Sequence, residues 1–387
     1  MLQTKVLNII KAVRKTILNF IKSNWHTGGL FFFIFFSDLL TSIWLQEKFN
    51  YSFLVKSFSI IFLFFYIERK LIWFLLLSYL LISIGLVFNY QDDIIKRTAL
   101  FFEYFSGILI LNYFIKINSK KKVKQALYII FIFYIINIFV AFSFQIDSFK
   151  TYSHRFGFMP LFSSQNEFSF IMIAAIIFFY NKLILQKNKF NFFLLACSII
   201  ASSIVGTKVL YLFILMFFNI IIYKKVQFKK YSLFVVIIIV LNLVFLDIWR
   251  KIMNNHFKNL VGFYEKHGFL NTLSSFRLEY LQDRLSCQAT NFKNINYLFG
   301  GSVLSCITEM SFIDIFLFFG FIGVILYVYM YKIFVFNSLK LDFVASFFII
   351  STVLLSFLGG YYFENFSAQF YFMSVLYVFY HKPVENK

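Results

Sequence analysis

Charged residues are scarce in this sequence: they make up 14% of its 387 residues, whereas a soluble domain carries roughly 25%. Proline is rarer still, with two residues against 62 Phe and 24 Tyr. Hydrophobic residues account for 60% of the chain, and the mean hydropathy is +0.78. These values exclude an ordinary soluble domain. Because a span needs about 20 apolar residues, we expect a single all-α membrane domain over 1–387, with about twelve helices and no separate soluble domain.

Cations are few in the short loops on one side of the expected membrane domain. The predicted spans lie at about 29–45, 51–67, 71–88, 98–117, 126–144, 166–181, 191–206, 207–223, 231–248, 311–331, 343–358 and 367–381. With both termini in the cytoplasm, 23 Lys and Arg fall in inner segments. Six fall in short outer loops: Lys48, Lys96, Arg97, Lys150, Arg155 and Lys208. This asymmetry is the positive-inside pattern, so the net charge of +20 sets the topology and requires no nucleic acid.

The sequence also lacks a cleavable signal, a metal-ligand spacing and an internal repeat. Residues 1–27 contain KVLNIIKAVRKTILNFIK, which predicts an amphipathic cytoplasmic N-terminus lying on the inner leaflet. We expect no metal and no other cofactor. The missing repeat disfavours the common transporter folds. Of three cysteines, Cys197 lies in a span, while Cys287 and Cys306 share an outer loop. Their spacing leaves open whether they form a disulfide.

Four ionisable residues lie within the predicted spans: Asp38, Lys56, Glu103 and Asp314. Each costs roughly 2.5–3.5 kcal/mol at mid-membrane, so each is a functional candidate unless it snorkels to the interface or pairs with another helix. All except Asp38 fall in the outer part of their helices. This distribution favours a site on the outer surface over a conduit across the membrane.

Two outer loops contain the polar residues that could carry chemistry. The first, 145–165, contains His154 and Arg155 and leads into Asn166-Glu167 at the next span. The long loop, 249–310, contains TLSSFRLEYLQDRLSC, which predicts an amphipathic helix with Ser275 or a neighbour as its N-cap. Arg277 and Arg284 are two turns apart on one face of it. Their guanidinium groups match phosphate oxygens, so they suit either a lipid diphosphate or phospholipid headgroups.

The order of these features resembles the bacterial O-antigen and capsule repeat-unit polymerases of the Wzy type and their relatives, the O-antigen ligases. The stretches that carry the resemblance are Arg155-Phe156-Gly157, Ser164-Gln165-Asn166, Gly206-Thr207-Lys208, Arg277 with Tyr280, Leu298-Phe299-Gly300-Gly301, Glu309, and Gly320 with Gly323. The family's Pro before Asn166 is missing, and Lys208 replaces an Arg. Ligases have a conserved His late in the long loop, and none occurs between Gly300 and Ser311. This departure favours a polymerase.

The resemblance implies a metal-independent glycosyltransferase in the bacterial inner membrane. It would polymerise undecaprenyl-diphosphate-linked oligosaccharide units into O-antigen or capsular polysaccharide, with membrane lipid and a chain-length regulator as further partners. Arg155, Arg277, Arg284 and Lys208 would neutralise the diphosphate. Glu309, His154 or Glu167 would act as the base. Asn166, Gly300 and Gly301 would contact substrate. The alternatives are an O-antigen ligase and, from another class, a polysaccharide flippase or transporter.

Overall fold

The computed structural model describes residues 25–43, 51–87, 94–146, 149–151, 157–159, 164–225, 277–301, 306–308, 310–359 and 362–382. The described helices are α2 (Trp25–Ile43), α3 (Tyr51–Phe64), α4 (Arg69–Val87), α5 (Ile94–Ile117), α6 (Lys120–Ser143), α7 (Gln165–Leu185), α8 (Lys189–Val205), α9 (Lys208–Lys225), α13 (Arg277–Asn291), α14 (Asn294–Phe299), α15 (Ser311–Phe334), the short 3-10 helix η3 (Phe336–Ser338), α16 (Phe343–Gly359) and α17 (Phe366–Tyr380). Within these ranges there is no strand, only two isolated β-bridges.

The prediction of an all-α membrane protein is confirmed at the level of fold class. Helices α4, α5, α6, α7 and the α15–η3 segment are long and apolar enough to cross a membrane. The remaining apolar helices are shorter, so the predicted number of twelve spans stays a prediction. Every predicted span except 231–248 overlaps a helix, and that one lies outside the described residues, as does the expected N-terminal helix. Helix α6 begins at Lys120, six residues before the prediction.

The helices start where polar side chains can accept the first backbone N–H groups. Ser164 accepts from Glu167 N at the start of α7, and Asn188 accepts from Asn191 N at the start of α8. Asn365 does the same for Ala368 N at the start of α17. These are N-cap interactions. Gly206 ends α8 in the left-handed conformation, with a φ of 75°, as is common at a helix C-terminus.

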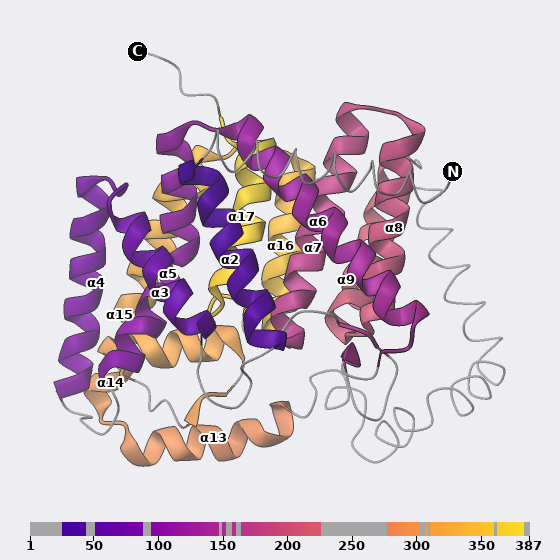
Figure 1. Cartoon of the computed structure of the whole chain (residues 1–387). Helices are drawn as coiled ribbons and strands as arrows, with labels where there is room; N and C mark the ends of the chain where they lie inside the picture. Colours follow the sequence, from indigo (N-terminus) through magenta and orange to yellow (C-terminus); the bar gives the residue numbers. More distant parts are fainter. Residues whose placement is uncertain are drawn as a thin grey trace.

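The helices form one bundle with α17 in its interior (Figure 1). Aromatic side chains from several helices interlock around α17. Phe114 of α5 stacks on Tyr377 with ring centroids 5.5 Å apart, and Phe131 of α6 packs against Tyr371 at 5.9 Å. The exposed large side chains on the outer helices are mostly apolar, for example Trp73, Phe192 and Leu215. Such a surface suits a bilayer and not water.

The two ends of the bundle differ in their loops. The upper end in Figure 1 has the α5–α6 and α7–α8 connections and the end of α17; we call it the basic end. There Lys120 Nζ donates to His381 O (2.8 Å) and Tyr380 Oη donates to Asn181 Oδ1 (2.7 Å). The lower end, which we call the α13 end, has α13, α14 and the starts of α7, α9 and α17.

Candidate functional site

A cluster of charged residues lies buried toward the α13 end. Lys56 Nζ on α3 is 3.0 Å from Glu167 Oε1 on α7 and 3.8 Å from Asp38 Oδ1 on α2. Ser367 Oγ at the start of α17 donates to Asp38 Oδ1 at 3.3 Å. Asp38 and Glu167 are only 4% and 3% exposed. The ion pairs therefore join α2, α3 and α7. Lys56 pairs with residues of other helices, which is one of the alternatives given for it in the sequence analysis.

Glu103 belongs to the same charged region. Its carboxylate on α5 interacts electrostatically with Lys56. Lys56 thus interacts with three carboxylates, two of which pair with it directly, in an interior where unpaired charge is costly. The sequence analysis singled out Asp38, Lys56 and Glu103 separately. Their meeting with Glu167 could not be predicted because it depends on how four helices pack.

The described residues of the 145–165 loop dock on the α8–α9 turn. Thr151 N donates to Gly157 O (2.8 Å), Phe158 N donates to Ile204 O (3.0 Å), and Thr151 Oγ1 donates to Val205 O (2.9 Å). Gly157 has a φ of 147°, and a Cβ there would lie 2.6 Å from Val205 O. Glycine is therefore required at this close approach. The loop's Gly157 and the α8–α9 turn, both noted from the sequence, form one unit.

The start of α7 is tied into this unit. Ser169 Oγ and Thr207 Oγ1 are 2.7 Å apart, and Gln165 Nε2 donates to Thr151 O. Lys208 begins α9 directly after Thr207 and is half-buried, as is Asn166 at the start of α7. The structure therefore brings Asn166 and Lys208 to neighbouring helix ends, while the Glu167 carboxylate is held by Lys56. His154 and Arg155 lie outside the described residues.

A second junction forms where α14 meets α4 and α15. Asn296 is fully buried, and its Nδ2 donates to Gly85 O and Gly300 O, both at 2.9 Å. A Cβ on Gly85 would lie 2.2 Å from Gly300 O, and one on Gly320 would lie 2.3 Å from Gly300 N. Three backbones therefore touch here, and only glycine allows that approach. The predicted Gly300-Gly301 turn is thus a packed part of the core.

Helix α15 breaks at this junction. The sequence predicts one span at about 311–331, and the structure shows that Gly320, with φ 66° and ψ 177°, separates two helical parts. Gly301 N donates to Phe318 O at 3.1 Å, so the turn after α14 supplies a donor to a carbonyl just before the break. The physical reason for the break is this insertion of the Gly300-Gly301 backbone, which a continuous helix would exclude.

Asp314 organises the segment before α15. Its Oδ1 accepts from Thr308 N (2.7 Å) and Thr308 Oγ1 (2.9 Å), and its Oδ2 accepts from Met310 N (3.0 Å). Asp314 is 4% exposed. Its carboxylate thus satisfies backbone donors beside a helix start, which is a structural role. Glu309, between these two donors in the chain, lies outside the described residues.

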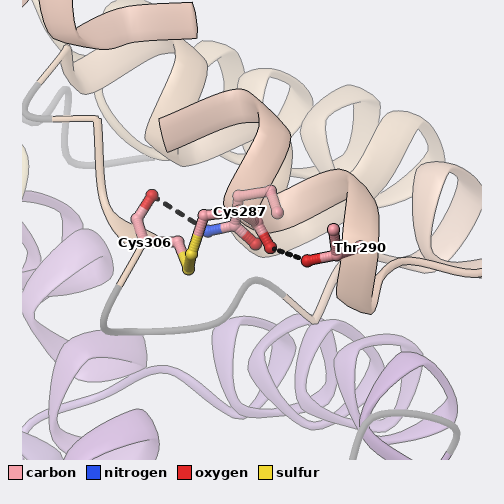
Figure 2. Close-up of a disulfide and its surroundings, with 4 residues drawn as sticks. Cys287, Thr290 and Cys306 are labelled. Carbon is pink, nitrogen blue, oxygen red and sulfur yellow. Dashed lines mark hydrogen bonds between the residues drawn. A yellow bond between two sulfur atoms is a disulfide. The ribbon is translucent and has the colours of Figure 1, made fainter. Parts of the chain in front are cut away.

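The predicted amphipathic helix of the long loop is confirmed as α13, which begins at Arg277. Its expected N-cap, Ser275, lies outside the described residues. Cys287 of α13 is disulfide-bonded to Cys306, with Cα atoms 5.8 Å apart (Figure 2). Beside the disulfide, Gln288 Nε2 donates to Cys306 O at 3.2 Å. Two links therefore fix α13 to the segment that leads to Asp314.

The two α13 arginines differ in exposure: Arg277 is half-buried, whereas Arg284 is exposed. Both lie at the α13 end, as does Lys208 at the start of α9 (Figure 1). Helix α13 lies outside the packed bundle, so Arg277 and Arg284 lie beyond the end of the bundle toward which the buried carboxylates lie. Such cations can bind an anionic group at the surface of the membrane domain.

Several residues of this region escaped the sequence analysis. Gln369 Nε2 donates to Glu103 O (2.9 Å), and its Oε1 accepts from Gly107 N (2.9 Å). Tyr104 Oη donates to Glu364 Oε1 at 3.0 Å. A usable signal existed for Glu364 and Gln369, because both are polar residues near the start of an apolar run. No comparable signal exists for Asn296, whose neighbours are ordinary loop residues.

The described residues contain no group of three or more His, Cys, Asp and Glu side chains placed to hold a metal ion. A comparison of the chain with protein-family models, curated proteins and solved structures finds no match. The fold class, a helical protein with membrane-span helices, therefore comes from the chain's own sequence and structure.

Proposed function

We propose that this protein is a membrane glycosyltransferase that polymerises lipid-linked oligosaccharide units at its α13 end. The observation that carries the proposal is the joint placement of the motif segments. Gly157 docks on the turn before Lys208, and Gly300-Gly301 docks on Gly320 beside the segment tethered to α13. Each junction packs together stretches that are far apart in sequence, and both junctions lie at the α13 end of the bundle (Figure 1), where a site built from both outer loops would form.

The distribution of cations supports an orientation with the basic end in the cytoplasm. The connections and helix ends there contain Arg69, Lys70, Lys116, Lys120, Lys121, Lys122, Lys124, Lys182, Lys187, Lys189, Lys332, Lys340 and Lys382. Fewer described cations lie toward the opposite end, where they are Lys56, Lys96, Arg97, Lys150, Lys208, Arg277, Arg284 and Lys293, and this asymmetry suits the positive-inside rule. The twelve-span topology with both termini inside belongs to this proposal.

The proposed reaction joins two lipid-linked units. The donor's diphosphate leaves as the sugar–phosphate bond breaks, and cations stabilise the developing charge. Arg277 and Arg284 on α13, together with Lys208 and Arg155, are suited to that role. The acceptor sugar hydroxyl loses its proton to a base as the new glycosidic bond forms. Among the candidate bases, Glu167 is already paired with Lys56, which weakens it as a base and favours Glu309 or His154.

Two other functions remain to be tested against this one. An O-antigen ligase would use the same end of the bundle to transfer finished glycan. A flippase is favoured by one observation, the break in α15 at Gly320, because broken helices are frequent in transporters. The buried charges weigh against it: Lys56, Asp38 and Glu167 are paired within the helix bundle.

The experiment that separates these functions is a gel profile of surface polysaccharide from a deletion strain. The strain is complemented with the wild type, with Arg277→Ala, or with the matched control Arg69→Ala, whose side chain is exposed at the basic end. We expect single repeat units in the deletion strain and with Arg277→Ala, and a full ladder with the other two. Lipid-linked polymer accumulating in the deletion strain would indicate a ligase. Repeat units retained on the cytoplasmic side would indicate a flippase.

A further inference from the structure

A membrane-facing groove runs between α15, α16 and α17. Its volume is about 190 Å³, and its lining is almost wholly apolar. The floor includes Tyr327, Met373 and Leu376, which are 5%, 4% and 1% exposed. Val328 and Phe312 also line it and are 58% and 39% exposed. The groove is therefore closed toward the bundle and open toward the surrounding lipid.

The groove is long in the direction of the helix axis. After the break at Gly320, its lining on α15 runs from Val324 to the C-cap residue Val335, which at 1.5 Å per residue is about 17 Å. The hydrocarbon core of a bilayer is about 30 Å thick, so this length matches about one leaflet. An extended hydrocarbon chain fits such a slot, whereas a polar ligand would lose its hydration without gaining hydrogen bonds.

The charges at the two ends of the groove are opposite. At the basic end the groove reaches Val335 and Phe336, next to Lys332, Lys340 and Lys382, all of which are exposed. Lys382 Nζ donates to Asn337 O at 3.0 Å, which holds it at this end of the groove. At the α13 end the lining residues Tyr362 and Phe363 are followed directly by Glu364. An anionic headgroup is therefore favoured at the basic end and disfavoured at the other.

We propose that this groove binds one acyl chain of an anionic phospholipid, with the lipid phosphate against Lys332, Lys340 and Lys382. The length of the slot suits a chain confined to one leaflet, and the lysines supply the charge complement. The lysines that would hold the phosphate lie at the basic end, on the opposite side of the membrane domain from α13. The inference is independent of the proposed glycosyl transfer.

The headgroup is tested with the full-length protein purified in detergent and titrated with dioleoyl phosphatidylglycerol or dioleoyl phosphatidylcholine. Binding is measured by native mass spectrometry. We expect phosphatidylglycerol to bind more tightly. Each lysine beside an anionic lipid contributes about fivefold in affinity, so the Lys332→Gln/Lys340→Gln variant should bind it about thirtyfold more weakly. The control Lys121→Gln/Lys122→Gln removes the same charge from α6, which does not line the groove, and should bind as the wild type does.

The acyl chain is tested with Val328→Trp, which places an indole at the mouth of the groove. The matched control is Ile325→Trp on the lipid-facing side of the same helix, where the side chain is 56% exposed. We expect weaker phosphatidylglycerol binding in the first variant only. Equal affinity for the two phospholipids, or equal losses in both lysine pairs, would overturn the proposal. Displacement by an isoprenyl phosphate that itself binds more tightly than phosphatidylglycerol would assign the groove to an isoprenoid instead.

Discussion

Lys56 is the residue on which the buried charge balance depends. Its ammonium group lies 3.0 Å from Glu167 and 3.8 Å from Asp38, and both carboxylates are almost fully buried. Removing one partner of a buried pair leaves uncompensated charge and costs roughly 3–5 kcal/mol. We therefore expect Lys56→Met to lower the thermal unfolding temperature of the purified protein strongly.

The matched control for Lys56→Met is Lys70→Met, because Lys70 is exposed at the basic end. Its effect should be small, as surface charges contribute about 0–1 kcal/mol. Adding Glu167→Gln to Lys56→Met should recover part of the lost stability, since it removes one of the unpaired carboxylates. If Lys56→Met and Lys70→Met unfold at the same temperature, the buried ion pairs do not stabilise the bundle.

At the scale of elements, the break in α15 depends on a single glycine. Gly320 has a backbone conformation that is essentially limited to glycine, and other residues pay of order 1–3 kcal/mol there. A Cβ would also lie 2.3 Å from Gly300 N. We expect Gly320→Ala to separate α14 from α15, with faster proteolysis of the 294–310 region and a lower unfolding temperature.

Gly29→Ala is the control for this substitution. A Cβ at Gly29 in α2 would meet nothing closer than 4.0 Å, and alanine has a higher helix propensity by up to about 1 kcal/mol. This variant should be as stable as the wild type or slightly more stable. Unchanged proteolysis of Gly320→Ala would show that α15 can become continuous without loss of the α14 junction.

At the scale of the whole molecule, the disulfide reports which side of the membrane the α13 end faces. Structural disulfides persist in oxidising compartments and are rare in the cytosol. The structure bonds Cys287 to Cys306 and leaves Cys197 as the free cysteine. We expect a maleimide-polymer reagent to add once to the protein denatured without reductant, and three times after reduction.

The double variant Cys287→Ser/Cys306→Ser is the control, and it should add the reagent once in either condition. Three additions without reductant would place the α13 end on a reducing side. The proposed orientation, with the basic end in the cytoplasm, would then be wrong.

The architecture could be predicted further than the site. Apolar runs of span length locate the membrane helices. The placement of Arg277 and Arg284 on one helical face locates α13. Both signals could be used because they are local in the sequence. The Lys56–Glu167 pair and the Asn296–Gly85 contact join residues 111 and 211 positions apart. Local pattern contains no information on such pairs. Glycine gave a partial signal. Gly300, Gly301 and Gly320 could be singled out in the sequence, but their close approach in the fold could not be predicted.

Helix α17 follows all the other described helices in the sequence, yet it lies in the interior of the bundle (Figure 1). Its Gln369 forms hydrogen bonds with backbone groups of α5, and its Ser367 donates a hydrogen bond to Asp38. Until α17 has been synthesised, the helices that precede it therefore surround an unfilled centre in the bilayer. The described bundle can close only after α17 has been made, and a chain truncated before α17 should be recognised as incomplete by membrane quality control.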